Sequence, residues 1–323
     1  MGRYLIRRLL FMILVLFVVA VFTFLIFLKL PAGDPARRAA GKAATADSIE
    51  AARHALGLDL PSYVQFGRFA KGLVPWPGLF LNKQVYFSFG DNVPVRDEIF
   101  KRFPITVTLA VGGAVVWLAM GIPIGIASAI KRRTIVDRSG MMFALVGVSA
   151  PVFFLGYLLL YVFHYKIPLA PGSGIPPGQS VGTSILQGRY ILPWITIAIT
   201  SAAFYARMVR GNMLESMSED YIRTARAKGL SERKVIYKHA MRASLTPVVT
   251  MLGLDVGLLF GGAVITETVF NLPGLGKYAI DSIFNNDIPA TMGVTVFAAL
   301  FIVIANLVVD VLYAFLDPRV RYT

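Results

Sequence analysis

The chain has 323 residues, of which 56% are hydrophobic and only 15% charged, and its formal net charge is +14 at pH 7. The length would allow two soluble domains, but soluble domains carry roughly 25% charged residues, so the composition argues against that class. The chain contains no cysteine, which excludes disulfides and thiolate metal sites.

Six apolar runs are long enough to cross a bilayer as helices, which takes about 20 residues each. The predicted spans are residues 9–28, 105–130, 141–163, 191–208, 247–269 and 291–316. Six buried helices of a soluble protein would need amphipathic segments to cover them, and the sequence offers too few. We therefore predict an all-α, polytopic membrane protein with six transmembrane helices.

Lysine and arginine residues alternate in density from one predicted loop to the next. They precede the first span, fill the loop after residue 130, are densest between spans four and five, and follow the sixth span. The short loops on the other side carry only Lys166, Arg189 and Lys277. The positive-inside rule therefore places both termini in the cytoplasm, and the net charge reflects membrane orientation rather than nucleic-acid binding.

The first part of the chain, residues 1–30, is expected to be an N-terminal span that is not cleaved. Its basic start resembles a signal peptide, but its apolar run of about 20 residues is longer than the usual 7–15. Residues 31–104 follow as a small external subdomain, since loops of that length cross the membrane largely regardless of charge. This subdomain is either a docking surface for an external partner or a cap over the spans.

Local signals within the external subdomain predict its elements. Asp47 and Glu50 have the spacing of a capping box that opens a helix over 48–56, and Pro61 suits the start of a second helix. Tyr86 is one of several aromatic residues that suit an interfacial belt. Residues 95–103 predict an amphipathic helix on the membrane surface before the second span.

The remaining residues, 105–323, form a predicted core of five spans that contains a cytoplasmic loop at 210–247. Within this loop, residues 219–247 are too charged to cross a bilayer but rich in helix-forming residues. Gly229 is placed as the glycine that ends a helix with positive φ. Ser231 suits the N-cap of a second helix, with Glu232 in its first turn. The pattern predicts a helix, a sharp turn and a second helix.

This stretch resembles the cytoplasmic "EAA" loop of ATP-binding-cassette (ABC) importer permeases, in which Glu-Ala-Ala is followed by three residues and a glycine. The matching positions are Arg223, Thr224, Ala225 and Gly229, so the glutamate and the first alanine are replaced. The residues after Glu219 resemble the dipeptide, oligopeptide and nickel branch of that family. Further matches to this branch are LPAGDP at 30–35, LGLDLP at 56–61, GGAVITETVFNLPGLG at 261–276 and LDPRVR at 316–321.

The resemblance implies a type I ABC importer permease fold in a bacterial or archaeal plasma membrane. It implies a second, similar permease, two cytoplasmic ATPase subunits and an external substrate-binding protein as partners. Di- or oligopeptides are the expected substrates, with nickel complexes and oligosaccharides as alternatives. The residues expected to couple to the ATPase are Arg223, Thr224, Ala225, Arg226, Gly229, Leu230, Ser231 and Glu232.

The chain itself is not expected to be an enzyme or to hold a cofactor or metal. The pair Gly276-Lys277 is the closest approach to a phosphate-binding loop, but Asn271 stands where that loop requires a glycine. The histidines lie far apart in the sequence, without ligand spacing. ATP hydrolysis is therefore expected in a separate subunit.

Span five carries the candidates for the translocation pathway. Ionisable groups inside spans default to functional hypotheses, and Asp255 either lines the pathway or makes a hydrogen bond between helices. Glu267 either lines the pathway or ties the turn that follows. Gly257 and Gly261 belong to a stripe of small residues that permits close helix approach, either at a static seam or at a moving one.

Two other classes of function stay open at the level of the sequence. A secondary transporter would couple to ions through intramembrane charges and would need no charged helical loop. A membrane receptor or scaffold would use the same loop to hold a soluble partner without transport.

Overall fold

The structure is a computed structural model of the full chain. It describes all residues except 1, 31–33, 41–43, 73, 75–79, 82–85, 89–92 and 317–323, and it does not describe the side chains of 2–5, 38, 39, 55, 250, 253, 254, 256–262 and 308–316. Helices make up most of the described residues, and an antiparallel ribbon joins two strands of two residues each, β1 (Phe87–Ser88) and β2 (Val93–Pro94). The predicted all-α class is confirmed.

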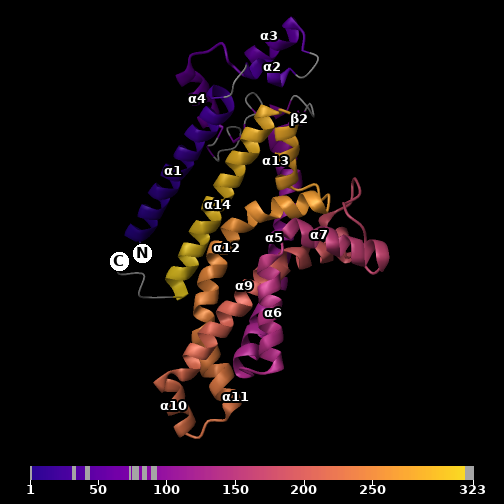
Figure 1. Ribbon diagram of the computed structural model, residues 1–323. Coiled ribbons are helices and arrows are strands. Elements are labelled where there is room, and N and C mark those ends of the chain that lie inside the picture. Colours follow the sequence, from indigo (N-terminus) through magenta and orange to yellow (C-terminus); the bar gives the residue numbers. More distant parts are fainter. Residues whose placement is uncertain are drawn as a thin grey trace. The chain divides into compact units, whose positions relative to one another are not determined.

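The chain forms two compact units, residues 1–106 with 273–323 (unit 1) and residues 107–272 (unit 2). In unit 1, α1 (Gly2–Phe24) continues into a π-helical turn, η1 (Leu25–Lys29), and packs along α14 (Ile288–Leu316) (Figure 1). The smaller helices of this unit are α2 (Pro35–Ala39), α3 (Ala46–Ala55), α4 (Ser62–Lys71) and α13 (Leu275–Phe284). Within this unit, described parts of the expected external subdomain pack on α1 and α14.

An aromatic core holds unit 1 together. Phe24 of α1 lies 5.4 Å from Phe66 and 6.1 Å from Phe69, measured between ring centroids, and both partners belong to α4. Tyr86 lies 6.0 Å from Phe69 and is buried, with its hydroxyl donating to the Phe69 carbonyl at 3.2 Å. The prediction that Tyr86 belongs to an interfacial belt is therefore wrong, because its ring fills the core instead.

Two local predictions in this unit also fail. The N-cap of α3 is Thr45, whose side chain accepts from the Ser48 amide at 3.3 Å, so the helix begins before the predicted capping box at Asp47. Residues 95–103 do not form a separate surface helix, because they open α5 (Val95–Ile130). This helix runs on through Pro104, and Val95 and Ile99 are buried where a surface helix would expose them to lipid.

Unit 2 is organised around α9 (Ile191–Ser218). It packs against α6 (Ile135–Ser149), α7 (Val152–Leu160) and α12 (Met241–Val269). Alanine is the commonest residue on its buried face, which includes Ala202 and Ala206. A methyl group added at Gly125 of α5 would lie 2.6 Å from the Ala206 carbonyl oxygen, and one at Gly121 would lie 2.9 Å from that of Ala202. The two glycines therefore let α5 approach α9 closely.

Helices occupy all six predicted spans. Four helical segments of the described part are long and apolar enough to cross a membrane, namely Ile6–Lys29, Val95–Ile130, Ile191–Ser218 and Ile288–Leu307. The fifth predicted span coincides with α12, several of whose side chains lie outside the described residues. The helix at the fourth predicted span, α9, extends ten residues beyond the predicted end at residue 208, so Arg210 lies within a regular helix.

The third predicted span is not one straight helix. α6 ends at Ser149, and the chain then bends by 105° before α7 begins. α7 continues into the π-helical turn η2 (Tyr161–Lys166). The bend lies at Pro151, and Ala150 before it is extended at φ −83° and ψ 126°. A proline disfavours helical backbone in the residue that precedes it, which accounts for the break.

The close contact between α5 and α9 leads to a first prediction. Gly125→Val should lower the stability of the folded chain by about 1–3 kcal/mol, because the added side chain meets backbone that cannot move aside. Thermal melting of the detergent-purified protein measures the loss. Gly211→Ala is the matched control, since a methyl group there meets nothing within 4 Å. Equal melting of the two variants would contradict this packing.

Candidate functional site

The polar element between α9 and α12 folds as a short helix, a turn and the start of a long helix. α10 (Asp220–Ala227) is separated from α9 by one extended residue, Glu219, at φ −68° and ψ 150°. After the turn, α11 (Glu232–Lys234) passes through a π-helical stretch, η3 (Val235–Ala240), directly into α12. The second helix of the predicted pair is therefore the beginning of the fifth span.

One face of α10 is buried against the chain itself. Ile222 is 0% exposed and Ala225 7%, and α10 packs on both α9 and η3. Val235 and Ala240 of η3 are fully buried on the other side of the contact. The small residue at 225 is thus required by packing within the chain. The opposite face of α10, which includes Arg223 and Thr224, is exposed.

The turn itself depends on Gly229. Its φ is +74°, the left-handed region predicted for this position, and its amide donates to the Arg226 carbonyl at 2.9 Å. The Leu230 amide donates to the Ala225 carbonyl at 3.4 Å, so the last carbonyls of α10 are satisfied in the manner of a glycine-terminated helix. Nothing lies within 4 Å of the place where a β-carbon at Gly229 would stand.

An ion pair spans this turn. The Arg226 Nε lies 2.6 Å from the Glu232 Oε1, so α10 and α11 are joined across the glycine. Ser231 has the extended backbone of an N-cap, but its side chain makes no capping hydrogen bond. The predicted N-cap position is therefore correct in backbone geometry and wrong in its side-chain bond.

The outer surface of the element is exposed and polar. Arg223 pairs with Asp220 at 3.2 Å, and the Thr224 hydroxyl donates to the Asp220 carbonyl at 3.0 Å. Tyr221 and Tyr237 expose about half of their surface, at 44% and 51%. Exposed tyrosine and arginine side chains are enriched where proteins bind other proteins. The predicted coupling residues thus form one continuous element, although Ala225 faces inward.

Hydrogen bonds join the base of the element to both long helices. The side-chain amide of Asn212 in α9 donates to the backbone carbonyl of Ser244 in α12 at 3.3 Å. The Ser244 hydroxyl lies within 3.2 Å of the Asn212 carbonyl and 3.1 Å of the Ser216 hydroxyl. The element is therefore attached to a junction in which α9 and α12 are linked.

A buried ion pair near this junction is not among the predicted site residues. Arg210 of α9 donates from Nε and Nη2 to the two carboxylate oxygens of Asp137 in α6, at 2.6 and 2.8 Å. The Arg133 amide donates to the same carboxylate at 2.9 Å, from a backbone with φ +64°. One sequence signal was available, because Asp137 is the only acid among the basic residues 131–138.

Comparison with known proteins decides the class. The family model of the "binding-protein-dependent transport system inner membrane component" matches residues 121–322, and the N-terminal model of the same system matches residues 1–110. The chain belongs to this family. It is the membrane permease subunit of an ABC importer of the peptide and nickel branch, and it works within a complex of ABC transporter subunits.

Relatives and a solved structure agree with this assignment. The permease is 41% identical, over 100% of both chains, to the glutathione transport system permease protein GsiC of Escherichia coli strain K12 and of Salmonella paratyphi A. A crystal structure of an amino acid ABC transporter with histidines covers 69% of this permease and 94% of its own chain. The identity is 15% and the TM-score 0.52, which shows a shared fold.

The predicted pathway residues have different surroundings. Asp255 of α12 accepts a hydrogen bond from the Tyr205 hydroxyl of α9 at 2.6 Å, and Tyr205 also lies 5.9 Å from the buried Trp117 ring. Glu267 is 0% exposed, and its carbonyl accepts from the Leu272 amide in the following turn at 2.8 Å. The surroundings of Gly257 and Gly261 lie outside the described residues.

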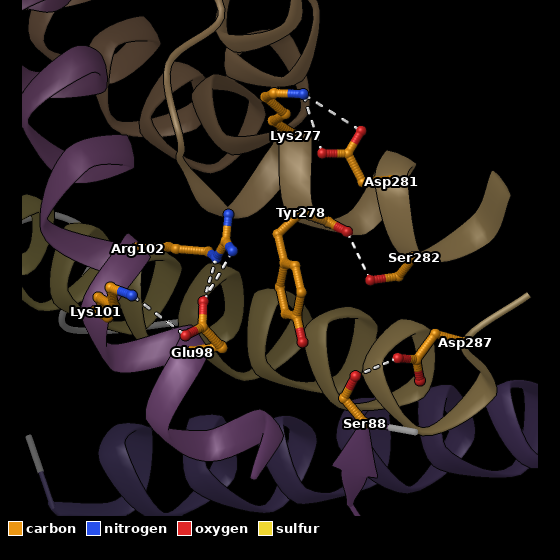
Figure 2. Close-up of polar contacts among 9 residues, drawn as sticks. All are labelled: Ser88, Glu98, Lys101, Arg102, Lys277, Tyr278, Asp281, Ser282 and Asp287. Carbon is orange, nitrogen blue, oxygen red and sulfur yellow. Dashed lines mark hydrogen bonds and ion pairs between the residues drawn. The ribbon is translucent and has the colours of Figure 1, made fainter. Parts of the chain in front are cut away.

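The segment after this turn is fixed by contacts within unit 1. The Leu275 amide donates to the Thr106 hydroxyl at 2.8 Å, and the Arg102 guanidinium lies 4.5 Å from the centre of the Tyr278 ring. Figure 2 shows Arg102 beside Tyr278 and joined to Glu98, whose carboxylate it pairs with at 2.8 Å. These contacts hold α13 against the first turns of α5.

The pair Asp137–Arg210 gives a second prediction. Asp137→Asn should destabilise the permease on the order of 2 kcal/mol, because two charged hydrogen bonds from Arg210 lose their charged acceptor. Thermal melting of the purified protein measures the change. The control is Asp220→Asn, whose exposed pair with Arg223 should contribute below about 1 kcal/mol. If both variants melt alike, Asp137 does not tie α6 to α9.

Proposed function

We propose that this permease forms, with a second and similar permease, the membrane path of an importer for small peptides. An external binding protein delivers the substrate, and two cytoplasmic ATPase subunits supply the energy. The element from Asp220 to Lys234 docks on one of these ATPases. The observation that carries the proposal is the exposed turn at Gly229, attached by one residue to α9 and by an unbroken helix to α12.

This attachment supports a mechanical role. A displacement of the turn passes to α12 without an intervening loop, and it passes to α9 through Glu219 alone. The bonds between Asn212 and Ser244 keep the two helices together at their base. Closure of the ATPases can therefore move α9 and α12 as a unit and change which side of the membrane the path faces.

The proposed orientation places the turn and both termini in the cytoplasm. The loop 131–134 and the α10–α11 turn lie toward the same end of unit 2 in Figure 1, and the pair Asp137–Arg210 links the two regions. At the opposite end of α9, about 42 Å away for 28 residues, stands the sparsely charged loop 167–190. This distribution supports cytoplasmic placement of the basic end.

A small peptide is the proposed substrate. The relatives at 41% identity are named for glutathione, which is a tripeptide. We assign Asp255 to the path, where its carboxylate would attract the ammonium group of a peptide and Tyr205 would hold it in place through the 2.6 Å hydrogen bond. Gly257, Gly261 and Glu267 are proposed to border the same path on α12.

Uptake in proteoliposomes tests the function. The complete complex is reconstituted with binding protein outside and ATP or no ATP at the ATPase side, and radiolabelled glutathione, a dipeptide, a nickel complex or an oligosaccharide is offered. We expect ATP-dependent accumulation of peptide only. Uptake that persists without ATP would identify an ion-coupled transporter, and absence of any uptake would favour a scaffold.

Substitution of Gly229 tests the docking turn. Gly229→Val should weaken association with the ATPase and lower uptake, because a β-branched residue at positive φ costs on the order of 1–2 kcal/mol or shifts the turn. Pull-down through the ATPase and peptide uptake are the measurements. Gly229→Asn is the control, since asparagine tolerates this backbone. Arg226→Ala should have a small effect, because exposed ion pairs contribute about 0–1 kcal/mol. Full association and uptake of Gly229→Val would refute the docking role.

The proposed orientation is tested with single cysteines, for which the cysteine-free chain is a clean background. Lys228→Cys and Ser173→Cys place one exposed thiol at each end of unit 2. An impermeant maleimide added to intact spheroplasts should label position 173 and leave position 228 unlabelled until the membrane is opened. Labelling of position 228 in sealed spheroplasts would reverse the orientation.

A further inference from the structure

The turn between α5 and α6 surrounds an open depression in the surface of unit 2. Its volume is about 540 Å³, and it is lined by Lys131, Arg133, Thr134, Ile135, Val136 and Arg138. All six residues are exposed. Neither the docking turn nor the proposed path includes them, so the function described above leaves this depression without a role.

The charge of the depression is strongly positive. Lys131, Arg133 and Arg138 line it, and no ion pair engages their side chains within the part of the chain that the structure describes. Asp137 is the only acid of this turn, and its carboxylate is buried and bound to Arg210. The one available counter-charge therefore faces inward, and the depression attracts anions.

Apolar side chains stand beside these cations. Ile135 is 80% exposed and Val136 40%, and both line the same depression. A free inorganic anion gains nothing from contact with an isoleucine side chain. A ligand that is anionic at one end and apolar at the other matches both halves of the lining.

The position of the turn identifies that ligand. It joins Ile130, at the end of a helix long and apolar enough to cross a membrane, to Ile135, at the start of the bent pair of apolar helices α6 and α7. We therefore expect the turn at the level where headgroups meet acyl chains. We propose that the depression binds the headgroup of an anionic phospholipid. Lys131, Arg133 and Arg138 contact the phosphate, and Ile135 and Val136 contact the first part of an acyl chain.

Binding there has a mechanical consequence. The ligand contacts the residues on both sides of Asp137, whose carboxylate is held by the Arg133 amide and by Arg210 of α9. A bound lipid therefore stabilises the ordered turn that presents Asp137 to α9. The lipid acts through α9, the helix that leads into α10, and it is not part of the proposed peptide path.

The test uses the delipidated transporter complex in detergent, titrated with phosphatidylglycerol or phosphatidylcholine and analysed by native mass spectrometry. We expect phosphatidylglycerol to be retained in preference to phosphatidylcholine. Arg138→Gln and Lys131→Gln should each weaken its retention about fivefold, the equivalent of about 1 kcal/mol for each cation at a membrane surface. Arg132→Gln is the matched control, because Arg132 belongs to the same turn but does not line the depression.

Further variants and ligands distinguish a bound lipid from diffuse attraction, a free anion and a protein partner. Arg138→Lys should retain the lipid, and Ile135→Ser should weaken its retention. An equal loss in Arg132→Gln would show diffuse attraction and overturn the site. Displacement by millimolar inorganic phosphate would overturn the lipid in favour of a free anion. Loss of the ATPase from Arg138→Gln with lipid retention unchanged would assign the surface to a protein partner. Peptide uptake by the unmodified complex reports separately on the transport function.

Discussion

The closeness with which neighbouring helices approach α9 is the constraint on which unit 2 depends. In a bilayer, lipid tails solvate apolar side chains about as well as another helix does, so helices are held by van der Waals contact and polar bonds. Gly121 and Gly125 of α5, with Gly147 of α6, meet Ala202, Ala203 and Ala206 of α9 at distances that leave no room for a methyl group. Small side chains on both partners therefore determine where α9 lies.

Polar bonds then fix the neighbours of α9 at three levels. Asp255 of α12 binds Tyr205 within the span, Asp137 of α6 binds Arg210 further along, and Ser244 of α12 binds Asn212 at the base. Each bond uses a group that would be costly to leave unpaired away from water. Together they connect α9, which leads into α10, to α6 and α12.

The proposed docking element, Asp220 to Lys234, is buried at its base and exposed at its tip. Ile222 and Val235 are fully buried where α10 rests on η3, whereas Gly229 has nothing within 4 Å of its missing side chain. A turn of this kind contributes little to the stability of its own chain. Its positive φ instead preserves the shape of the turn, which is what a surface that fits another protein requires.

Local patterns in the sequence determined the class of this protein. Hydropathy predicted a helix at each of six places, and the turn at Gly229 followed from glycine's access to positive φ. The family resemblance named the permease branch that the comparisons confirm. These features depend on residues that are neighbours in the chain, so they can be predicted from the sequence. Tertiary structure alone decided the passage of α5 through Pro104 and the inward direction of Ala225. It also brought Asp137 to Arg210, 73 residues away, and Tyr205 to Asp255, 50 residues away. Such pairs form only when two helices adopt one rotation and one spacing, and that choice is made by the packing of small residues against α9.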